Sequence, residues 1–279
     1  MSDFQTYKIG ENIGGRVTIT NIIAEPEGRH PVYLVWDHQN WCPSVCKIFR
    51  NSRRAQQEHE VLTRVAHPNI VKSMGTLEPA MMLLEYLAGD TLDNYAARQP
   101  RGRMPLSDAL RTVVHLGCAL EHVHRQGYVH LDIKPGNIII SNGRPVLFDF
   151  GTARRIGASR PSVVQGTDAY MAPEECALGD VSPASDVYSL AVTLFELLTA
   201  EIPYPEPTEE VPYPQMHEIA RPLRELRPQL PHSLEQLLAR CLDRDPAKRP
   251  ELRRLLPELN GLITKGPKMW PDMLDLAAA

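Results

Sequence analysis

Apolar residues in the front part of the chain, up to about residue 90, cluster in short runs rich in β-branched side chains. Such runs, bounded by turn residues, are typical of β-strands rather than helices. They predict strands at 17–25, 32–36, 45–49, 70–76 and 81–86. One segment, 53–65, has apolar positions at helical spacing, and the helix is expected to stop before His67 and Pro68.

Beyond Thr91 the apolar positions take the spacing of amphipathic helices. Helices are predicted near 107–126, 185–199, 233–242 and 251–262. Ser107 is the expected N-cap of the first of these, because its hydroxyl could accept a bond from the first turn. Two short strands, 138–140 and 145–148, flank the turn residues Asn142 and Gly143.

The pattern predicts an α+β protein with a small strand-rich lobe, which carries one helix, and a larger helical lobe. The expected divisions are an N-terminal extension (1–20), the strand-rich lobe (21–87), the helical lobe (88–264) and a C-terminal tail (265–279). The tail reads as a linker or tag remnant.

Composition narrows the function classes. The 279 residues are 43% hydrophobic and 23% charged, with a net charge of −4, so a nucleic-acid partner is not expected. No apolar run approaches the roughly 20 residues of a membrane span, and no signal peptide is recognised, so we expect a cytoplasmic chain without a membrane segment. Cys42 and Cys46 lack zinc-ligand spacing, and His115, His122 and His124 are expected to face solvent or an interface.

Several short motifs follow one another in a fixed order. Lys47 lies in an apolar strand and Glu58 on the predicted helix, and they are followed by His130–Asn137, Asp149–Gly151 and Ala172–Glu174. These residues resemble the protein kinase family, in its bacterial eukaryotic-like serine/threonine branch, and the resemblance covers nearly the whole chain. It implies a bilobal protein kinase fold and transfer of the ATP γ-phosphate to Ser or Thr of protein substrates.

The resemblance implies a role for each catalytic residue. Asp132 would accept or orient the proton of the substrate hydroxyl, and Lys134 would reach the γ-phosphate. Asn137 and Asp149 would hold Mg²⁺, which prefers oxygen ligands. Lys134, together with Thr167 in the substrate groove, favours serine/threonine over tyrosine specificity.

On the nucleotide side, Lys47 would bind the ATP phosphates and pair with a helix glutamate. The family spacing to the following proline selects Glu58 over Glu60. A lysine inside an apolar strand needs such a partner, because burying an unpaired charge is costly. Cys46 replaces the family's alanine beneath the adenine, and a thiol is small and apolar enough for that place.

The adenine pocket and the phosphate-covering loop are assigned by position. Val32 would help to enclose the adenine, while the Glu85 carbonyl and the Leu87 N–H would face its edge. The spacing from Val32 to the lysine places the covering loop at 25–31, where only Gly28 remains of the family's glycines. Residues 10–15, although glycine-rich, are expected to form a turn in the N-terminal extension.

Regulation is expected to depart from the family pattern. Most members carry an arginine before the catalytic aspartate, which can pair with a phosphorylated activation segment, whereas this chain has Leu131. Activity is therefore predicted not to depend on phosphate at hydroxyls such as Ser159 and Ser162. Two supporting contacts are also implied: Asp186 with the catalytic-loop backbone, and Arg249 with the glutamate of the Ala172–Glu174 motif.

Two other functions compete with an active kinase. A pseudokinase that serves as a binding or scaffold module would account for the degraded loop around Gly28 and for Leu131, but not for the retained catalytic residues. A small-molecule kinase of similar fold is disfavoured by Thr167 and the Ala172–Glu174 motif, which belong to peptide-binding architecture. Protein substrates are the expected partners, and self-association into a homodimer is left open.

Overall fold

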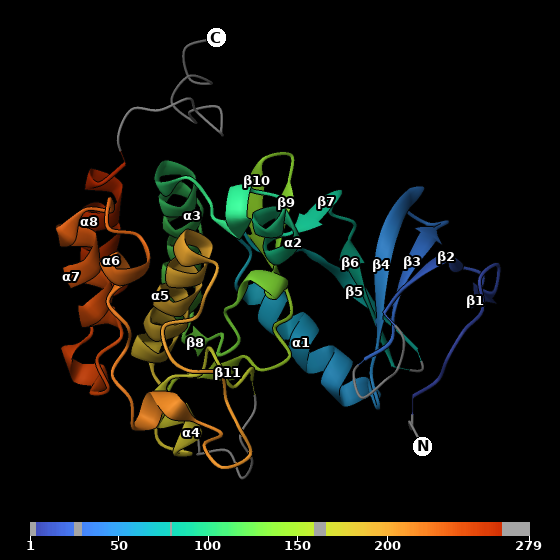
Figure 1. The fold of residues 1–279 in the computed structure, drawn as a ribbon. Coiled ribbons are helices and arrows are strands. Elements are labelled where there is room, and N and C mark those ends of the chain that lie inside the picture. The colour runs from blue at the N-terminus through green and yellow to red at the C-terminus, as the bar shows by residue number, and fades with distance from the viewer. Residues whose placement is uncertain (1–3, 25–29, 79, 159–165, 264–279) are drawn as a thin grey trace. The chain divides into compact units, whose positions relative to one another are not determined.

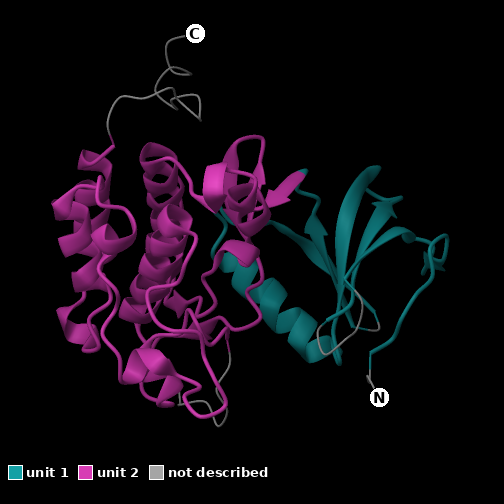
Figure 2. Ribbon diagram, viewed as in Figure 1, with its two compact units in different colours: residues 1–88 teal, residues 89–279 magenta. Residues whose placement is uncertain are grey.

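A computed structural model describes residues 4–24, 30–78, 80–158 and 166–263 (Figure 1). The chain divides into two compact units, residues 1–88 and 89–279 (Figure 2). The first unit is built around a sheet and the second mainly from helices, so the α+β prediction is confirmed. The expected tail, 265–279, lies outside the described residues.

The first unit holds a six-stranded sheet in the order β1-β2-β3-β4-β6-β5, with every neighbouring pair antiparallel. Alternate residues of β3 are buried, as expected for a sheet with one face on the core. The elements are β1 (Asn12–Ile13), β2 (Val17–Ala24), β3 (Val32–Asp37), β4 (Cys42–Ile48), α1 (Ser52–Arg64), β5 (Ser73–Leu77) and β6 (Met81–Glu85). The boundary expected after residue 20 falls inside β2.

Two strand starts differ from the prediction. Strand β4 begins at Cys42 rather than at residue 45, because β3 pairs with Cys42 and Pro43. A proline is tolerated there because β6 pairs with β4 only from Ser44 onward. Strand β5 begins at Ser73 rather than at residue 70. The turn that follows α1 continues to Ile70, whose N–H donates to the His67 carbonyl at 3.0 Å.

The second unit is organised around α5, whose residues are buried on nearly every side, as expected for a helix that is apolar all round. Helix α3 packs on both α5 and α8. The elements of the second unit are β7 (Gly89–Thr91), α2 (Leu92–Ala97), α3 (Leu106–Arg125), β8 (Tyr128–Val129), β9 (Ile138–Ser141), β10 (Arg144–Leu147), β11 (Arg154–Arg155), α4 (Pro173–Cys176), α5 (Pro183–Thr199), α6 (Leu223–Leu226), α7 (His232–Cys241), α8 (Leu252–Gly261) and the 3₁₀ turns Pro100–Gly102, Pro135–Asn137, Pro214–Met216 and Pro246–Lys248. None of the helices in the described part of the chain combines the length and apolar character needed to cross a bilayer.

Two local features of this unit were predicted from turn and capping residues, the β9–β10 hairpin and the start of α3. The β9–β10 hairpin is confirmed, and Asn142 and Gly143 both have positive φ (49° and 78°), as a tight hairpin turn requires. The N-cap prediction at Ser107 is wrong. Helix α3 begins one residue earlier, after Pro105, whose carbonyl accepts the N–H groups of Asp108 and Ala109.

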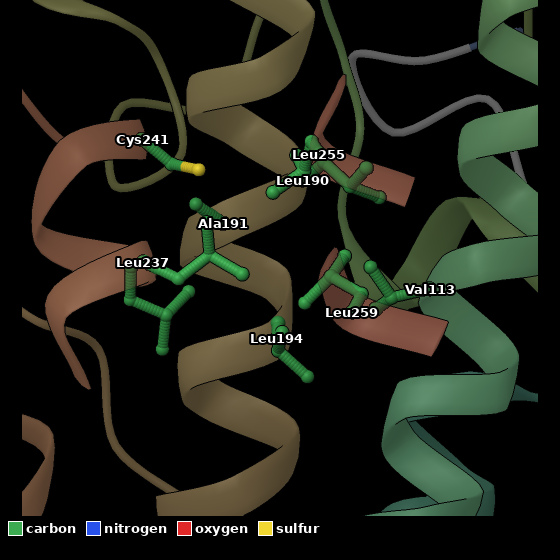
Figure 3. Close-up of a pocket in the computed structure, with 9 residues that line it drawn as sticks. Val113, Leu190, Ala191, Leu194, Leu237, Cys241, Leu255 and Leu259 are labelled. Carbon is green, nitrogen blue, oxygen red and sulfur yellow. The ribbon is translucent and has the colours of Figure 1, made fainter. Parts of the chain in front are cut away.

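Helices α3, α5, α7 and α8 leave a small cavity in the core of this unit (Figure 3). Because its lining is apolar, the cavity is a packing defect and not a site for a polar ligand. The lining residues are Val113, Leu190, Ala191, Leu194, Leu237, Leu238, Cys241, Leu255 and Leu259.

Candidate active site

The backbone of the loop after β8 is held in place by one buried carboxylate. Asp186, near the start of α5, accepts the backbone N–H of His130 at 2.9 Å and that of Leu131 at 2.8 Å. Leu131 has φ of +66°, a left-handed conformation that is unfavourable for leucine. The two bonds to Asp186 stabilise this conformation, so the predicted contact between Asp186 and the loop backbone is confirmed.

Four polar side chains meet at this loop, three from the loop itself and one from Thr167. Asn137 donates from its amide nitrogen to Asp132 Oδ2 (2.6 Å) and to the Asp132 carbonyl (2.9 Å). Lys134 Nζ lies 3.0 Å from Asp132 Oδ2 and also donates to the Thr167 hydroxyl. The Thr167 hydroxyl donates to Asp132 Oδ1 at 3.0 Å. The structure thus brings together the four residues predicted to act in transfer.

The segment that carries Asp149 packs against His130 of the same loop. The Phe150 ring packs edge-on against His130, with 4.5 Å between ring centroids. Full burial lowers the pKa of His130, which favours a neutral ring beneath the two carboxylates of Asp132 and Asp149. Asp149 has φ of +61°, which aspartate tolerates better than most residues.

Asn137 and Asp149 suit a magnesium ion. Both hydrogen bonds of the Asn137 side chain use its nitrogen, so its amide oxygen is the atom that could bind a cation. Among the described residues no group of three His, Cys, Asp or Glu side chains could hold a metal. Two oxygen ligands fit Mg²⁺, which usually completes its shell with water and substrate phosphates.

In the first unit, the lysine of β4 pairs with the helix glutamate predicted for it. Lys47 Nζ donates to both carboxylate oxygens of Glu58, at 2.9 Å and 3.0 Å. Both side chains are buried, at 8% and 4% exposure, so the pair is shielded from solvent. The choice of Glu58 over Glu60 is confirmed.

Val32 lies opposite Lys47 in the β3–β4 pair, and Cys46 is fully buried. Burial raises the pKa of the Cys46 thiol to about 12, so the side chain stays neutral. At the end of β6, the N–H and carboxylate of Glu85 both bond to the backbone of Lys72. The adenine contacts expected of the Glu85 carbonyl and the Leu87 N–H stay predictions.

The phosphate-covering loop was predicted at 25–31. Residues 25–29, which include Gly28, lie outside the described residues, as do Ser159 and Ser162. The other glycine-rich stretch forms turns, as predicted: Gly14 and Gly15 have positive φ, and Gly15 N–H donates to Asn12 Oδ1 at 2.8 Å. These residues close the β1–β2 hairpin.

Sequence reasoning missed one residue of the support. His124 was expected to face solvent or an interface, but its side chain is 8% exposed and its Nε2 lies 2.8 Å from Asp186 Oδ2. This contact is one of the influences that lower the pKa of Asp186 against the opposing effect of burial. Its place at the end of α3, just before the loop, was the only available signal.

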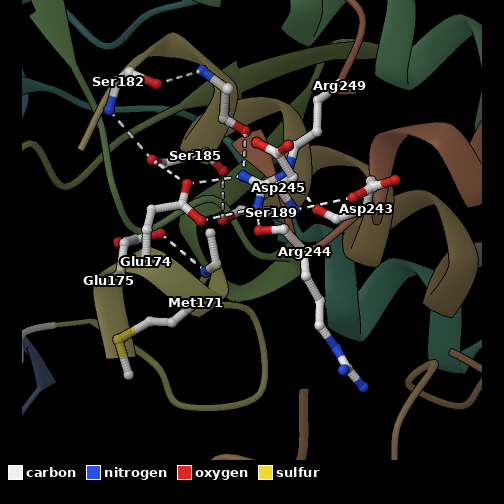
Figure 4. Close-up of polar contacts among 12 residues, drawn as sticks. Met171, Glu174, Glu175, Ser182, Ser185, Ser189, Asp243, Arg244, Asp245 and Arg249 are labelled. Carbon is white, nitrogen blue, oxygen red and sulfur yellow. Dashed lines mark hydrogen bonds and ion pairs between the residues drawn. The ribbon is translucent and has the colours of Figure 1, made fainter. Parts of the chain in front are cut away.

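A second buried pair ties α4 to the segment between the 3₁₀ turn Pro246–Lys248 and α8 (Figure 4). Arg249 forms a two-point bond with Glu174, with distances of 2.7 Å and 2.8 Å. Ser185 donates to the same carboxylate at 2.7 Å. The pairing of Arg249 with the glutamate of the Ala172–Glu174 motif, which the sequence implied, is confirmed.

Comparison with known proteins gives one consistent answer. The serine/threonine-protein kinase PknA of Mycobacterium tuberculosis is 29% identical over 262 residues, which cover 87% of this chain and 60% of PknA. PrkC of Bacillus subtilis is 30% identical over 259 residues, 87% of this chain and 40% of PrkC. This chain therefore spans less than two thirds of either relative. A crystal structure of the M. tuberculosis PknI kinase domain matches 92% of this chain and all of that domain, with a TM-score of 0.72 and 26% identity.

These likenesses agree with the three groups of side chains described above. The model of the family described as "Protein kinase domain" matches residues 31–258, a range that contains the Lys47–Glu58 pair, the cluster around Asp132 and the Glu174–Arg249 pair. The fold is the protein kinase fold, and the chain belongs to the protein kinase family.

Proposed function

We propose that this chain transfers the γ-phosphate of ATP to serine or threonine hydroxyls of protein substrates. The observation that carries the proposal is the cluster in which Lys134, Thr167 and Asn137 all bond to Asp132. The curated relatives are named as serine/threonine-protein kinases. The substrates and partners of the whole protein are part of the proposal, because the chain spans only part of those relatives.

The residues of the cluster suit an in-line transfer. Asp132, held at both carboxylate oxygens, would orient the substrate hydroxyl and take its proton as the new O–P bond forms and the bond to the ADP oxygen breaks. Lys134 would lend positive charge to the γ-phosphate during transfer. Thr167, which bonds to both side chains, would fix the spacing between the Asp132 carboxylate and the Lys134 ammonium.

Residues of the first unit would bind the nucleotide. Lys47, whose ammonium Glu58 orients, would bind phosphate oxygens, while Val32 and Cys46 would contact the adenine. The backbone of Glu85 and Leu87 would bond to its edge, and the loop that contains Gly28 would cover the phosphates. Mg²⁺, when bound, supplies charge neutralisation on the phosphates, and Asn137 and Asp149 would hold it.

We also propose that activity needs no phosphate on the activation segment. Leu131 is 6% exposed and apolar, so it cannot pair with a phosphate as an arginine would. The strained loop is held instead by Asp186. Replacing Ser159 and Ser162 by alanine, or treating the protein with a phosphatase, should leave kcat within about twofold. A loss of most activity in either case would refute this part of the proposal.

The transfer itself is tested with radiolabelled Mg-ATP and a generic protein substrate. Asp132→Asn keeps the size of the side chain but removes the proton acceptor, and labelling should fall by at least about a hundredfold. Asp108→Asn at the start of α3 makes the same change of charge elsewhere and should label normally. If wild type and Asp132→Asn incorporate equal phosphate, the chain is a binding module and the enzyme proposal fails.

A further inference from the structure

The sheet of the first unit begins before the part of the chain that matches the family. The family match starts at residue 31, yet residues 4–24 are part of the folded unit. The backbone pairs through Gly10 N–H to the Ile19 carbonyl (2.8 Å) and Ile19 N–H to the Glu11 carbonyl (2.9 Å). We call residues 4–11 the N-terminal strap.

The strap is anchored at its middle by a buried tyrosine. Tyr7 is 8% exposed and belongs to the apolar core of the sheet. Its backbone N–H donates to the Tyr33 hydroxyl at 3.1 Å, and the two rings meet edge-on with 6.1 Å between centroids. Burial raises the pKa of the Tyr7 hydroxyl to about 12, as expected for a phenol packed in a core.

The front end of the strap reaches a short stack of rings. The Phe4 ring meets His30 edge-on (5.2 Å, 72°), and the Arg50 guanidinium lies 5.1 Å from its centroid. His30 in turn packs on Phe49, with 4.9 Å between ring centroids. The His30 ring is fixed by its Nδ1–H, which donates to the Ile48 carbonyl at 2.8 Å.

The last ring of this stack supports the lysine of the proposed site. Phe49 is 4% exposed, and Lys47 Nζ lies 5.3 Å from its ring centroid. The same ammonium is held by Glu58. Lys47 therefore has two supports, a carboxylate and an aromatic face, and a cation over a desolvated ring is attracted to it.

We propose that the N-terminal strap positions Lys47 for ATP through the stack Phe4–His30–Phe49. This inference rests on the proposed function, since it names residues that act on the same lysine. Phe4, His30 and Phe49 are positioning residues: they do not touch substrate but limit where the ammonium can lie. Loosening the stack should weaken the binding of ATP and leave the transfer step, which Asp132 controls, nearly intact.

Phe4→Leu is the direct test, because it keeps an apolar side chain on a half-buried site and removes the ring. We expect the KM for ATP, and the Kd of a non-hydrolysable Mg-ATP analogue measured by calorimetry, to rise about twofold to fivefold. The kcat should stay within about twofold. Phe4→Trp, which restores a ring, should return both constants toward wild type. Ile9→Ala is the matched control, since Ile9 lies in the strap but its side chain is 61% exposed.

Two results would overturn the inference. One is a Phe4→Leu protein whose KM and Kd equal those of wild type; the other is a Phe4→Trp protein as impaired as Phe4→Leu. In a Phe49→Leu background, Phe4→Leu should add no further change, and an additive change would show that the strap does not act through the stack. Wild type without phosphate transfer would refute the proposed function instead, while the calorimetric comparison would still test the strap.

Discussion

The bond between Arg249 and Glu174 makes a demanding prediction about stability. The Arg249 side chain is fully buried, and Glu174 is 11% exposed. Arg249 also donates to the carbonyl of Asp243 at 2.7 Å (Figure 4) and to the carbonyl of Ala184 at 2.9 Å. Its guanidinium carbon lies 4.9 Å from the Tyr188 ring centroid. Its planar, five-donor head is used almost completely, which a lysine could not reproduce.

Arg249→Met keeps an unbranched apolar side chain at this position but leaves the Glu174 carboxylate buried without its cation. Removing one partner of a buried ion pair costs about 3–5 kcal/mol, so the free energy of unfolding should fall by about that amount. Arg249→Lys keeps the charge but loses the two-point geometry, so its free energy of unfolding should lie between that of Arg249→Met and that of wild type. Urea unfolding followed by circular dichroism measures all three.

The matched control lies close by in the sequence. Arg253 pairs with Glu251, but both side chains are largely exposed, at 70% and 58%. Such pairs contribute little to stability, so Arg253→Met should leave the urea midpoint unchanged. If Arg249→Met unfolds at the same urea concentration as Arg253→Met, the buried bond does not hold this region together and our reasoning is refuted.

Three further predictions concern the second unit. Burial raises the pKa of Glu175 to about 8 from an ordinary value of 4.5, so between these pH values the folded chain keeps a proton that the unfolded chain releases. The resulting contribution to stability is fully present below pH 4.5 and is lost as the pH rises to about 8. Glu175→Gln should therefore resist urea better than wild type at pH 8 and lose that advantage by about pH 5; equal midpoints at pH 8 would contradict it. Leu194→Ala enlarges the apolar cavity of Figure 3 and should cost about 2–5 kcal/mol in the same assay, whereas an unchanged midpoint would mean that the helices close over the gap. The side chain of His124→Asn is too short to reach Asp186, so this variant should lower kcat about tenfold or more and change the KM for ATP little. His124→Gln should recover the lost kcat. If the two variants have equal kcat, His124 does not act by positioning Asp186.

Much of the site could be predicted because its residues lie in short, ordered motifs. The resemblance to the family paired Lys47 with Glu58 and Thr167 with Asp132, and the structure contains both contacts. Asp186 was predicted because the residues around it resemble the family's helix aspartate that bonds the catalytic-loop backbone, and its carboxylate accepts two N–H groups of that loop.

The rest depends on packing that one-dimensional patterns do not carry. His124 resembles any polar residue near a helix end until the fold places Asp186 against it. Phe4 and Tyr7 stand as isolated aromatics among polar residues, with no periodicity to show that they pack on the sheet. The start of β4 before Pro43 follows from which neighbour strand is present, and not from the propensity of the segment.

If the cluster around Asp132 phosphorylates serine and threonine, mass spectrometry of a protein substrate incubated with Mg-ATP and wild type should detect phosphoserine and phosphothreonine. The same incubation with Asp132→Asn should yield neither. Phosphotyrosine as the main product, or the same yield of phosphoserine and phosphothreonine from both proteins, would contradict this function.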